Sequence, residues 1–454
     1  MTTAVVVGGG ISGLAGALAL SDAGDDVIVL ESSDRFGGKI RTTPFLGRPV
    51  DEGADAFLAR VPHAVELSRR LGLGDDLVSP ATGQASLWLD GVLKPIPAGL
   101  VLGVPAEFGP LAESGILSAE GLARAMEEPG LPGTPVTDDV TIGDLIRRRY
   151  GPEVHERLVD PLLGGINAGR TEALSLDVGA AQLAAVARTS ASLTEGLRAQ
   201  RRANPPDPSA PVFYAPRLGM ASLVDALVDA LGRAGAQLRT AAAVASIEPG
   251  YTVTTIDGEV VAADRVLVAA PAFVAAPLLA PLSPTAAAAL ASVAYASVTL
   301  VTLAYPTESV SRPIAGSGFL VPRTEGRLLT AGSVFSNKWP HLAEPDVVTV
   351  RASVGRHGDD RSLDWDDDTL VERVHAELAE VLGVSSRPAA TRVSRWPASF
   401  PQFPAGHLHH VAAVEAALAD DAPGLTLAGA YLRGVGIPAC IGGAQAAADR
   451  LHRT

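Results

Sequence analysis

Hydrophobic residues along this chain fall into short continuous runs separated by longer stretches with helical spacing, a pattern typical of α/β proteins. The first run, Ala4-Val5-Val6-Val7, predicts a buried parallel strand, and the apolar residues at 14–20 predict a helix directly after it. The run at 27–30 predicts the neighbouring strand. Further strands are predicted at 244–248, 265–270 and 425–430, and a hairpin at 251–261.

The middle of the chain shows two other patterns. Residues 110–202 are rich in helix formers and hold several helical repeats, such as 141–150, which predict an inserted helical lobe. Residues 292–391 alternate strand-like runs with one strong helix, Asp367 to Leu382, whose first turn is acidic. That segment predicts a sheet-based α+β lobe, which is the candidate substrate lobe.

These patterns divide the chain into five segments and predict a discontinuous dinucleotide-binding lobe. The proline-rich stretch 204–208 has the composition of a linker. We expect the dinucleotide-binding lobe to comprise residues 1–85, 206–291 and 392–454, the inserted helical lobe with a substrate-lobe segment to comprise 86–205, and the substrate-binding lobe to comprise 292–391. The predicted fold class is therefore α/β with an α+β substrate lobe.

A glycine motif stands between the first strand and the first helix. Gly8-Gly9-Gly10-Ile11-Ser12-Gly13 has the spacing G-x-G-x-x-G. In this context Gly8 permits a tight turn, Gly10 lets a pyrophosphate approach the backbone, and Gly13 lets helix and strand pack closely. The diphosphate would then lie on free amides at a helix N-terminus. Glu31, at the end of the second strand, is placed to accept a hydrogen bond from a ribose hydroxyl.

The segment after Glu31 distinguishes between two dinucleotides. NAD requires nothing particular there, whereas a flavin continues across the sheet, so that backbone must pass close to its pyrophosphate and ring. Gly37-Gly38 allow this approach because they carry no side chains. The two motifs together predict FAD, against the alternative of an ordinary surface turn. Near the other end, the turn at 434–438 and the helix predicted at 439–451 would aim free amides at the flavin's pyrimidine edge.

Composition narrows the class of protein further. The 454 residues are 47% hydrophobic and 19% charged, which indicates a globular protein, and the net charge of −14 argues against nucleic-acid binding. The single cysteine, Cys440, excludes an internal disulfide framework or thiolate zinc site and fits a reducing cytoplasm.

Two apolar stretches could be mistaken for membrane elements. Residues 4–23 have the apolarity of a signal peptide, but their glycines fall at dinucleotide-binding positions. Residues 285–305 have the length of a membrane span, but prolines crowd the entrance and the second half is β-branched. We interpret this stretch as a short helix followed by a strand and expect a cytoplasmic protein without stable membrane insertion.

Several segments resemble the HemY-type family of porphyrinogen oxidases, over nearly the whole chain. The most specific are Pro161 to Gly169, Asn337 to His341 and Arg433 to Pro438, and Asp51 to Phe57 also matches. Within that family the chain is most similar to the coproporphyrinogen III oxidases of Gram-positive bacteria, which are related to protoporphyrinogen oxidase. The resemblance implies the two-dinucleotide-binding FAD domain of the amine oxidase and protoporphyrinogen oxidase type.

The resemblance also implies an activity in haem biosynthesis. One FAD and molecular oxygen would remove six electrons from a porphyrinogen and release porphyrin and hydrogen peroxide. The next enzyme of the pathway is a candidate for transient contact. The FAD contacts implied by motif match are Gly8, Gly9, Gly10, Ile11, Ser12, Gly13, Glu31, Ser32, Lys39, Gly53, Ala54, Asp55, Ala56, Val244, Trp396, Val435, Gly436 and Ile437.

Candidate substrate residues are fewer. The resemblance implies that Gly165 lines the substrate cavity, because it matches a cavity position in relatives. The chain has only three lysines, and two of them, Lys94 and Lys338, are candidates to meet substrate propionates. Arg323 and Arg327, in a polar loop of the substrate lobe, are further candidates.

Catalytic and metal-binding residues receive no assignment. A porphyrinogen methylene is activated by its own pyrroles, so no acid–base residue is required and the catalytic residues stay unknown. His407-Leu408-His409-His410 could suggest a metal site, but no carboxylate or cysteine stands at ligand spacing, so we expect neutral loop histidines and no metal.

Three other functions stay open. The first is the oxidation of protoporphyrinogen IX by the same chemistry. The second is an amine oxidase or carotenoid desaturase of the same fold, although an aromatic content of 4% offers little for an amine cage. The third is a non-catalytic flavin-binding partner protein.

Overall fold

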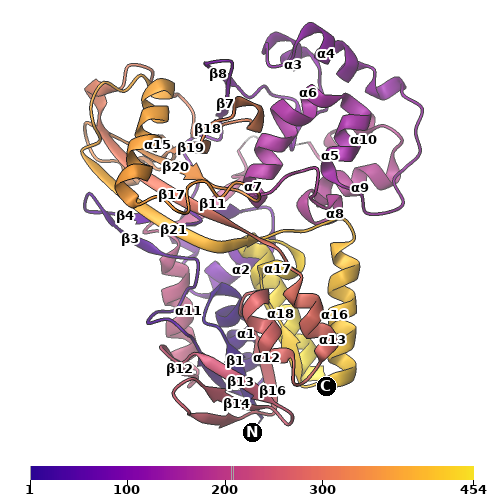
Figure 1. Cartoon of the computed structure of the whole chain (residues 1–454), viewed down its shortest axis with the longest axis vertical. Helices are drawn as coiled ribbons and strands as arrows, with labels where there is room; N and C mark the ends of the chain where they lie inside the picture. The colour runs from indigo at the N-terminus through magenta and orange to yellow at the C-terminus, as the bar shows by residue number, and fades with distance from the viewer. Residues whose placement is uncertain (1, 206, 208, 454) are drawn as a thin grey trace.

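A five-stranded parallel sheet forms the centre of the lower lobe in Figure 1. The computed structural model describes residues 2–205, 207 and 209–453. The strand order is β12-β2-β1-β16-β22, with bounds β1 Thr3–Val7, β2 Asp26–Leu30, β12 Gln237–Arg239, β16 Arg265–Val268 and β22 Leu425–Leu427. Val5 of the central strand lies opposite Ile28 on one side and Val266 on the other.

This sheet is covered on both faces, because its central strands are apolar at consecutive positions. Ala4 and Val6 pack towards α1 (Ile11–Asp22), α11 (Ala221–Arg233) and α18 (Ile437–Arg453). Val5 and Val7 pack towards the opposite layer. That layer consists of β13 Val244–Glu248, β14 Thr252–Thr255, β15 Val260–Ala262, α12 Ala272–Leu279, α13 Pro284–Ala291 and α16 His407–Asp421. The result is a three-layer α/β lobe, and the predicted fold class is confirmed.

A seven-stranded mixed sheet forms the upper left lobe in Figure 1. Its order is β21-β17-β20-β19-β18-β7-β8, with bounds β7 Ala85–Leu89, β8 Val92–Pro95, β17 Tyr295–Pro306, β18 Gly318–Leu320, β19 Leu329–Val334, β20 Val347–Val354 and β21 Ala390–Pro401. Helix α15 (Asp367–Leu382) packs its apolar side, including Leu370 and Val374, on this sheet. The expected boundary after residue 391 falls inside β21, which pairs with β17 as one strand.

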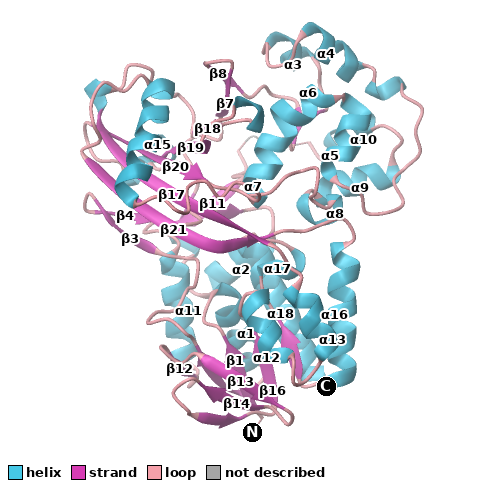
Figure 2. Cartoon of the chain, viewed as in Figure 1, coloured by secondary structure: helices cyan, strands magenta, loops and turns pink. Residues whose placement is uncertain are grey.

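The upper right lobe in Figures 1 and 2 is helical. Its helices are α3 Gly109–Glu113, α4 Ala119–Met126, α5 Ile142–Tyr150, α6 Pro152–Val154, α7 Gly165–Asn167, α8 Leu176–Gly179, α9 Ala181–Thr189 and α10 Leu193–Ala203. A π-helical segment, η3 (His155–Gly164), joins α6 to α7 and contains Pro161. Wide turns of this kind occur often at functional sites, and this one leads directly to Gly165.

Shorter elements connect the three lobes. They are β3 Thr42–Phe45, β4 Arg48–Asp51, β5 Phe57–Leu58, α2 Pro62–Arg70, η1 Gly74–Asp76, β6 Leu77–Val78, β9 Leu100–Val101, β10 Val104–Pro105, η2 Glu128–Gly130, β11 Phe213–Pro216, η4 Thr307–Ser309, η5 Arg323–Glu325, α14 Phe335–Lys338, η6 Pro340–Leu342 and α17 Ala430–Arg433.

Several predicted elements are confirmed. The stretch 285–305 is a short helix, α13, followed by a strand, β17, and the hairpin at 251–261 is β14–β15. In the part of the chain that the structure describes, no helix is both long and apolar enough to cross a membrane. Of the predicted linker at 204–208, residues 206 and 208 lie outside the described residues.

The prediction that His407 to His410 form a loop is wrong. These residues make the first turn of α16, directly after Gly406, whose φ of +82° turns the chain into the helix. The helix forms because Val411, Val414 and Leu418 recur at helical spacing and pack in the core against the parallel sheet.

Candidate cofactor site

The two glycine motifs predicted from the sequence contact each other. The Gly37 amide donates to the Gly9 carbonyl at 2.8 Å, and Gly10 and Gly37 form a single β-bridge. A Cβ atom built on Gly38 would lie 3.2 Å from the Gly10 Cα. The motif after the second strand therefore closes over the turn between β1 and α1.

Each glycine of the first motif meets a different constraint. Gly8 adopts a φ of +105°, which L-residues rarely adopt. A Cβ on Gly13 would lie 1.8 Å from the Gly8 carbonyl oxygen, so only glycine lets α1 pack this close to β1. A Cβ on Gly10 would meet nothing nearer than the Gly38 Cα at 4.0 Å. The space beside Gly10 is thus open, as a pyrophosphate requires.

Two helices begin at this place. A methyl group added at Gly16 of α1 would lie 3.6 Å from the Ala444 Cβ of α18, and Ser12 hydrogen-bonds with the Cys440 thiol four residues earlier in both helices. The two helices therefore run parallel, and both N-termini face the same site. In the described structure no side chain caps the start of α1. Two positive helix ends and uncapped amides suit an anion.

Glu31 is held in a fixed orientation at the end of β2. Its Oε2 accepts a hydrogen bond from the Gly9 amide at 2.7 Å, and its Oε1 accepts from the Ser33 amide at 2.8 Å and, more weakly, from the Ser32 hydroxyl at 3.3 Å. The Ala242 amide donates to the Glu31 carbonyl, which brings the chain just before Val244 to the same corner.

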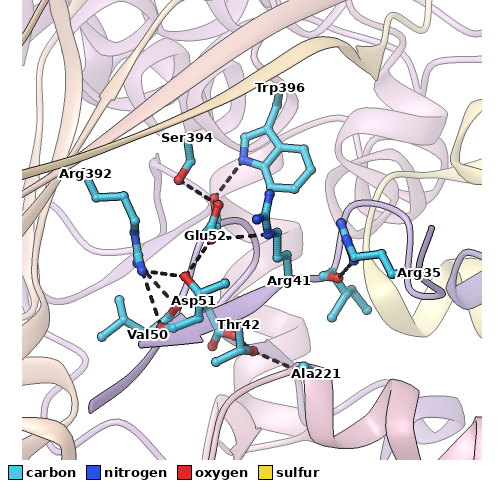
Figure 3. A network of polar contacts seen from close by, with 12 residues as sticks. Arg35, Arg41, Thr42, Val50, Asp51, Glu52, Ala221, Arg392, Ser394 and Trp396 are labelled. Atoms are coloured by element: carbon cyan, nitrogen blue, oxygen red, sulfur yellow. Dashed lines mark hydrogen bonds and ion pairs between the residues drawn. The ribbon is translucent and has the colours of Figure 1, made fainter. Parts of the chain in front are cut away.

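A third wall of the site comes from β21 and the loop after β4. The Trp396 ring lies beside Gly53, where an added Cβ would be 3.6 Å from the ring, and its Nε1 donates to the Glu52 carbonyl at 2.7 Å (Figure 3). The Lys39 ammonium donates to the Ser399 carbonyl, and burial lowers the pKa of Lys39. Residues of the two lobes thus meet here.

One buried hydroxyl group at this junction has no hydrogen-bond partner within the described residues. It is Ser399 Oγ, on the residue whose carbonyl accepts from Lys39. Buried hydroxyls are rarely left unpaired in folded proteins, so this one fits a polar ligand at the junction. Together with the open space at Gly10, it fits a dinucleotide.

The loop at 53–56 is fixed by a buried ion cluster. Asp55 accepts from the Lys338 ammonium at 2.8 Å and from the Trp339 Nε1 at 3.1 Å, and its second oxygen lies 3.1 Å from Arg351 Nη2. Arg351 also donates to the Gly53 carbonyl at 2.9 Å. Burial alone would raise the pKa of Asp55, but the charges of Arg351 and Lys338 outweigh it and hold the pKa well below its usual range.

Asp51, the last residue of β4, connects the β3–β4 hairpin to the start of α11. It accepts from the Thr42 hydroxyl at 2.5 Å and from the Met220 amide at 3.0 Å, while Thr42 accepts from the Ala221 amide (Figure 3). Burial raises the pKa of Asp51 to about 6, against the opposing effect of these hydrogen bonds.

This raised pKa predicts a pH dependence of stability. The folded protein holds the Asp51 proton more tightly than the unfolded chain, so the free energy of unfolding should fall as pH rises from about 4 to about 6. The Asp51→Asn variant should lack this decrease, which in the unaltered protein amounts to about 2–3 kcal/mol of unfolding free energy. Melting temperatures of both proteins between pH 4.5 and 7.5 test this. A difference in melting temperature that stays constant over this range would contradict it.

The structure places the predicted substrate residues at separate points. Gly165 follows η3, and a Cβ built on it would meet nothing within 4 Å. Lys94 donates to the Gly115 carbonyl at 2.6 Å, and Lys338 pairs with Asp55. Arg327 is bound to the Glu380 carboxylate, with Nη2 at 2.6 Å from Oε1. Substrate roles for these residues stay predictions, but both ammonium groups already have protein partners.

The buried histidines have structural hydrogen-bond partners. The His407 Nε2 donates to the Tyr431 carbonyl at 2.9 Å, and burial lowers the pKa of His407. A cluster that the sequence did not suggest combines His155, Asp160 and Glu172 within 4.8 Å of one another. Both His155 nitrogens have partners there, since Nδ1 accepts from Arg147 and Nε2 bonds the Thr171 hydroxyl at 2.7 Å. The arrangement is that of a hydrogen-bonded structural network.

Sequence reasoning missed Arg351 entirely. It lies 296 positions beyond Asp55 and belongs to the strand run at 347–352, where an arginine between apolar residues resembles an ordinary exposed position. The one available indication of its role was an arginine within an apolar strand, because a charge buried in such a strand requires a carboxylate partner.

Comparison with known proteins gives a consistent assignment over the whole chain. The family model described as "Flavin containing amine oxidoreductase" matches residues 11–452. The coproporphyrinogen III oxidase of Bacillus subtilis (strain 168) is 34% identical, with 98% of this chain and 96% of that protein covered. The coproporphyrinogen III oxidase of Mycobacterium bovis is 36% identical, with 97% and 95% covered.

A solved structure from Exiguobacterium sp. 255-15, provisionally assigned as a protoporphyrinogen oxidase, has the same fold. It superposes with a TM-score of 0.89 at 30% identity and covers 100% of this chain and 99% of that one. The agreement extends over all three lobes, because the alignment leaves none of them uncovered.

Proposed function

We propose that this protein, which belongs to the family of flavin-containing amine oxidoreductases, oxidises coproporphyrinogen III to coproporphyrin III with FAD as cofactor. Molecular oxygen is the electron acceptor and hydrogen peroxide the second product. The enzyme is an oxidoreductase that acts on CH–CH type bonds in haem biosynthesis. The nearly full-length similarity to two coproporphyrinogen III oxidases supports this choice of substrate.

The observation that carries the proposal is the convergence of both glycine motifs and two helix N-termini on one open space beside Gly10. Residues 8–13, Glu31 and Ser32 would hold the adenosine and pyrophosphate, with Val244 at the same corner. Lys39, Trp396, the loop 53–56 and the turn 435–437 would surround the flavin ring. The unpaired Ser399 hydroxyl fits this assignment because a flavin carries polar ring atoms.

A bound FAD would supply hydride-accepting and oxygen-reducing chemistry at the activated methylene of the porphyrinogen. The chain's own residues would position the reacting groups and exclude water from the site. The Asp55 cluster fixes the loop at 53–56, and the Lys39 contact with Ser399 joins the glycine motifs to β21. These contacts would make a rigid wall between the two lobes that positions the cofactor and the substrate for reaction. No side chain is assigned an acid–base role.

A second candidate is the oxidation of protoporphyrinogen IX, which is favoured by the similarity to the Exiguobacterium structure. The two substrates differ in charge, since coproporphyrinogen III carries four propionates and protoporphyrinogen IX carries two. We place the enzyme in the cytoplasm without stable membrane insertion or nucleic-acid binding, in transient contact with the next haem-pathway enzyme.

The test is an aerobic assay of the purified yellow protein with each porphyrinogen, followed by porphyrin fluorescence and hydrogen peroxide. We expect kcat/KM for coproporphyrinogen III to exceed that for protoporphyrinogen IX by about one to three powers of ten, because two more carboxylates are bound. Equal or faster turnover of protoporphyrinogen IX would favour the second candidate. A flavin-loaded protein that oxidises neither would overturn both.

A further inference from the structure

We propose that Arg323 and Arg356 bind a carboxylate of the substrate at the end of the π-helical segment η3. The inference rests on the proposed function, because it names the residues that recognise the acidic side chains of a porphyrinogen. It concerns the contact between the helical lobe and the seven-stranded sheet, away from the glycine motifs.

Arg356 has a nearly buried guanidinium without a hydrogen bond to any described residue. Its side chain is 12% exposed, and its nearest carboxylate oxygen, on Asp359, is 3.9 Å away. Its Nε is fully buried without a partner. Asp359 is already engaged by Arg361, with Nε–Oδ1 at 2.7 Å and Nη2–Oδ2 at 2.8 Å. Arg356 therefore has donors to offer and no acceptor within hydrogen-bond distance.

Arg323 approaches the same place from η5. Its Nη2 donates to the Gly169 carbonyl at 2.9 Å, but its Nε is buried and unpaired, 3.7 Å from an Asp160 oxygen. The other Asp160 oxygen accepts from the Thr171 amide and hydroxyl. Asp160 thus makes only a long contact with Arg323, and it acts on the neighbouring Arg356 without a hydrogen bond.

The carboxylates near Arg356 are engaged by other groups. Asp359 forms its short contacts with Arg361, and Asp160 lies beside Arg323 and accepts from Thr171. Burial and the charge of Arg323 lower the pKa of Arg356 to about 10. A buried guanidinium without a hydrogen bond is costly, so its persistence points to an anion that completes the cluster. Two guanidinium groups offer planar paired donors, which match a carboxylate.

The location suits a substrate. A Cβ built on Gly164 would lie 3.1 Å from both Asp160 Oδ1 and the Gly169 carbonyl oxygen, so the cluster abuts the end of η3. The next residue, Gly165, opens onto free space, and Ile166 is 51% exposed. The His357 amide, beside Arg356, donates to the Ala168 carbonyl at 2.7 Å. The arginine pair thus flanks the segment that the sequence assigns to the substrate cavity.

The Arg356→Gln variant of the FAD-loaded enzyme tests the inference. We expect KM for coproporphyrinogen III to rise about 10- to 100-fold with little change in kcat, because the lost contact is made equally before and during reaction. Binding of coproporphyrin III, titrated by fluorescence, should weaken by a similar factor. Binding of mesoporphyrin IX, with two carboxylates, should weaken less. Arg356→Lys keeps the charge but not the planar fork and should be intermediate.

Thermal stability separates this role from a structural one. Since the Arg356 guanidinium has no hydrogen bond among the described residues and only a 3.9 Å ion pair with Asp359, Arg356→Gln without substrate should melt at nearly the same or a higher temperature than the unaltered protein. The matched control is Arg188→Gln in the helical lobe, which loses a paired guanidinium (Nη2–Oδ2 of Asp177, 2.7 Å) and should leave KM unchanged.

Two results would overturn the inference. One is an Arg356→Gln variant with normal flavin content whose KM and porphyrin affinity equal those of the unaltered enzyme. The other is a fall in melting temperature of several degrees at unchanged KM, which assigns Arg356 to structure. Failure of the unaltered protein to oxidise either porphyrinogen is a different result, since it overturns the proposed function itself.

Discussion

The Gly10→Val variant should purify as a folded protein that carries no FAD. A Cβ built on Gly10 meets nothing nearer than the Gly38 Cα at 4.0 Å, so we expect the fold to accept a side chain there, yet that side chain would fill the place of the pyrophosphate. We expect FAD affinity to fall by about three powers of ten or more, equivalent to about 4 kcal/mol. Flavin absorbance after gel filtration, circular dichroism and the shift of melting temperature on adding FAD measure the two effects separately.

Two further glycine variants serve as controls. Gly13→Val should fail to fold, because its Cβ would lie 1.8 Å from the Gly8 carbonyl oxygen and neither backbone can move without separating α1 from β1. Gly443→Ala in α18 adds a methyl group where nothing lies within 4 Å and should keep FAD and gain slight stability. A yellow Gly10→Val protein with normal FAD affinity would disprove the assignment of this site.

The Asp55→Asn variant should be strongly destabilised. Its neutral amide would leave Arg351 and Lys338 without their shared carboxylate in a buried cluster, at a cost of about 3–5 kcal/mol. Flavin content should fall as well, because the loop at 53–56 loses its anchor. The measurements are the melting temperature and the FAD-to-protein ratio at pH 7.

The pH dependence of this variant gives an independent test. The pKa of Asp55 is depressed in the folded protein, so its contribution is present above the ordinary carboxyl range and is lost as pH falls below about 4. The unaltered protein should therefore lose stability over that acidic range more steeply than Asp55→Asn. Parallel curves, or equal melting temperatures at pH 7, would contradict the role assigned to the cluster.

Lys338→Met is the matched partner of that variant. Arg351 would still neutralise Asp55, so the loss of stability should be smaller than in Asp55→Asn. The same variant examines the sequence-based prediction that Lys338 meets a propionate, because such a role would raise KM beyond any change in stability.

Local patterns were sufficient to predict the elements around the cofactor site. The strand at 4–7, the turn at 8–13 and the helix after it are specified by neighbouring residues, because the glycines define the turn and the apolar run defines the strand. The contact between Gly10 and Gly37 could be expected because one ligand requires both glycine motifs. The ligand thus indicated a contact between distant residues that the sequence pattern alone does not indicate.

Other features depended on partners far along the chain. Nothing local indicates that Asp55 pairs with Lys338 and Arg351, or that β7 joins β18 in the large sheet. The histidine run at 407–410 was misread because its polar residues conceal a helix whose apolar positions begin only at Val411. Arg356 resembles the other arginines in the sequence, and only its burial without a hydrogen bond distinguishes it.

The parallel pairing of α1 with α18 sets an order of events during biosynthesis. These helices are separated by more than four hundred residues, yet each contributes one end to the same anion-binding space. A nascent chain still on the ribosome can form the first strand, turn and helix but lacks half of the pocket. Full enclosure of FAD would therefore require α18 as well as α1, so the complete pocket forms only after the late segment has been synthesised.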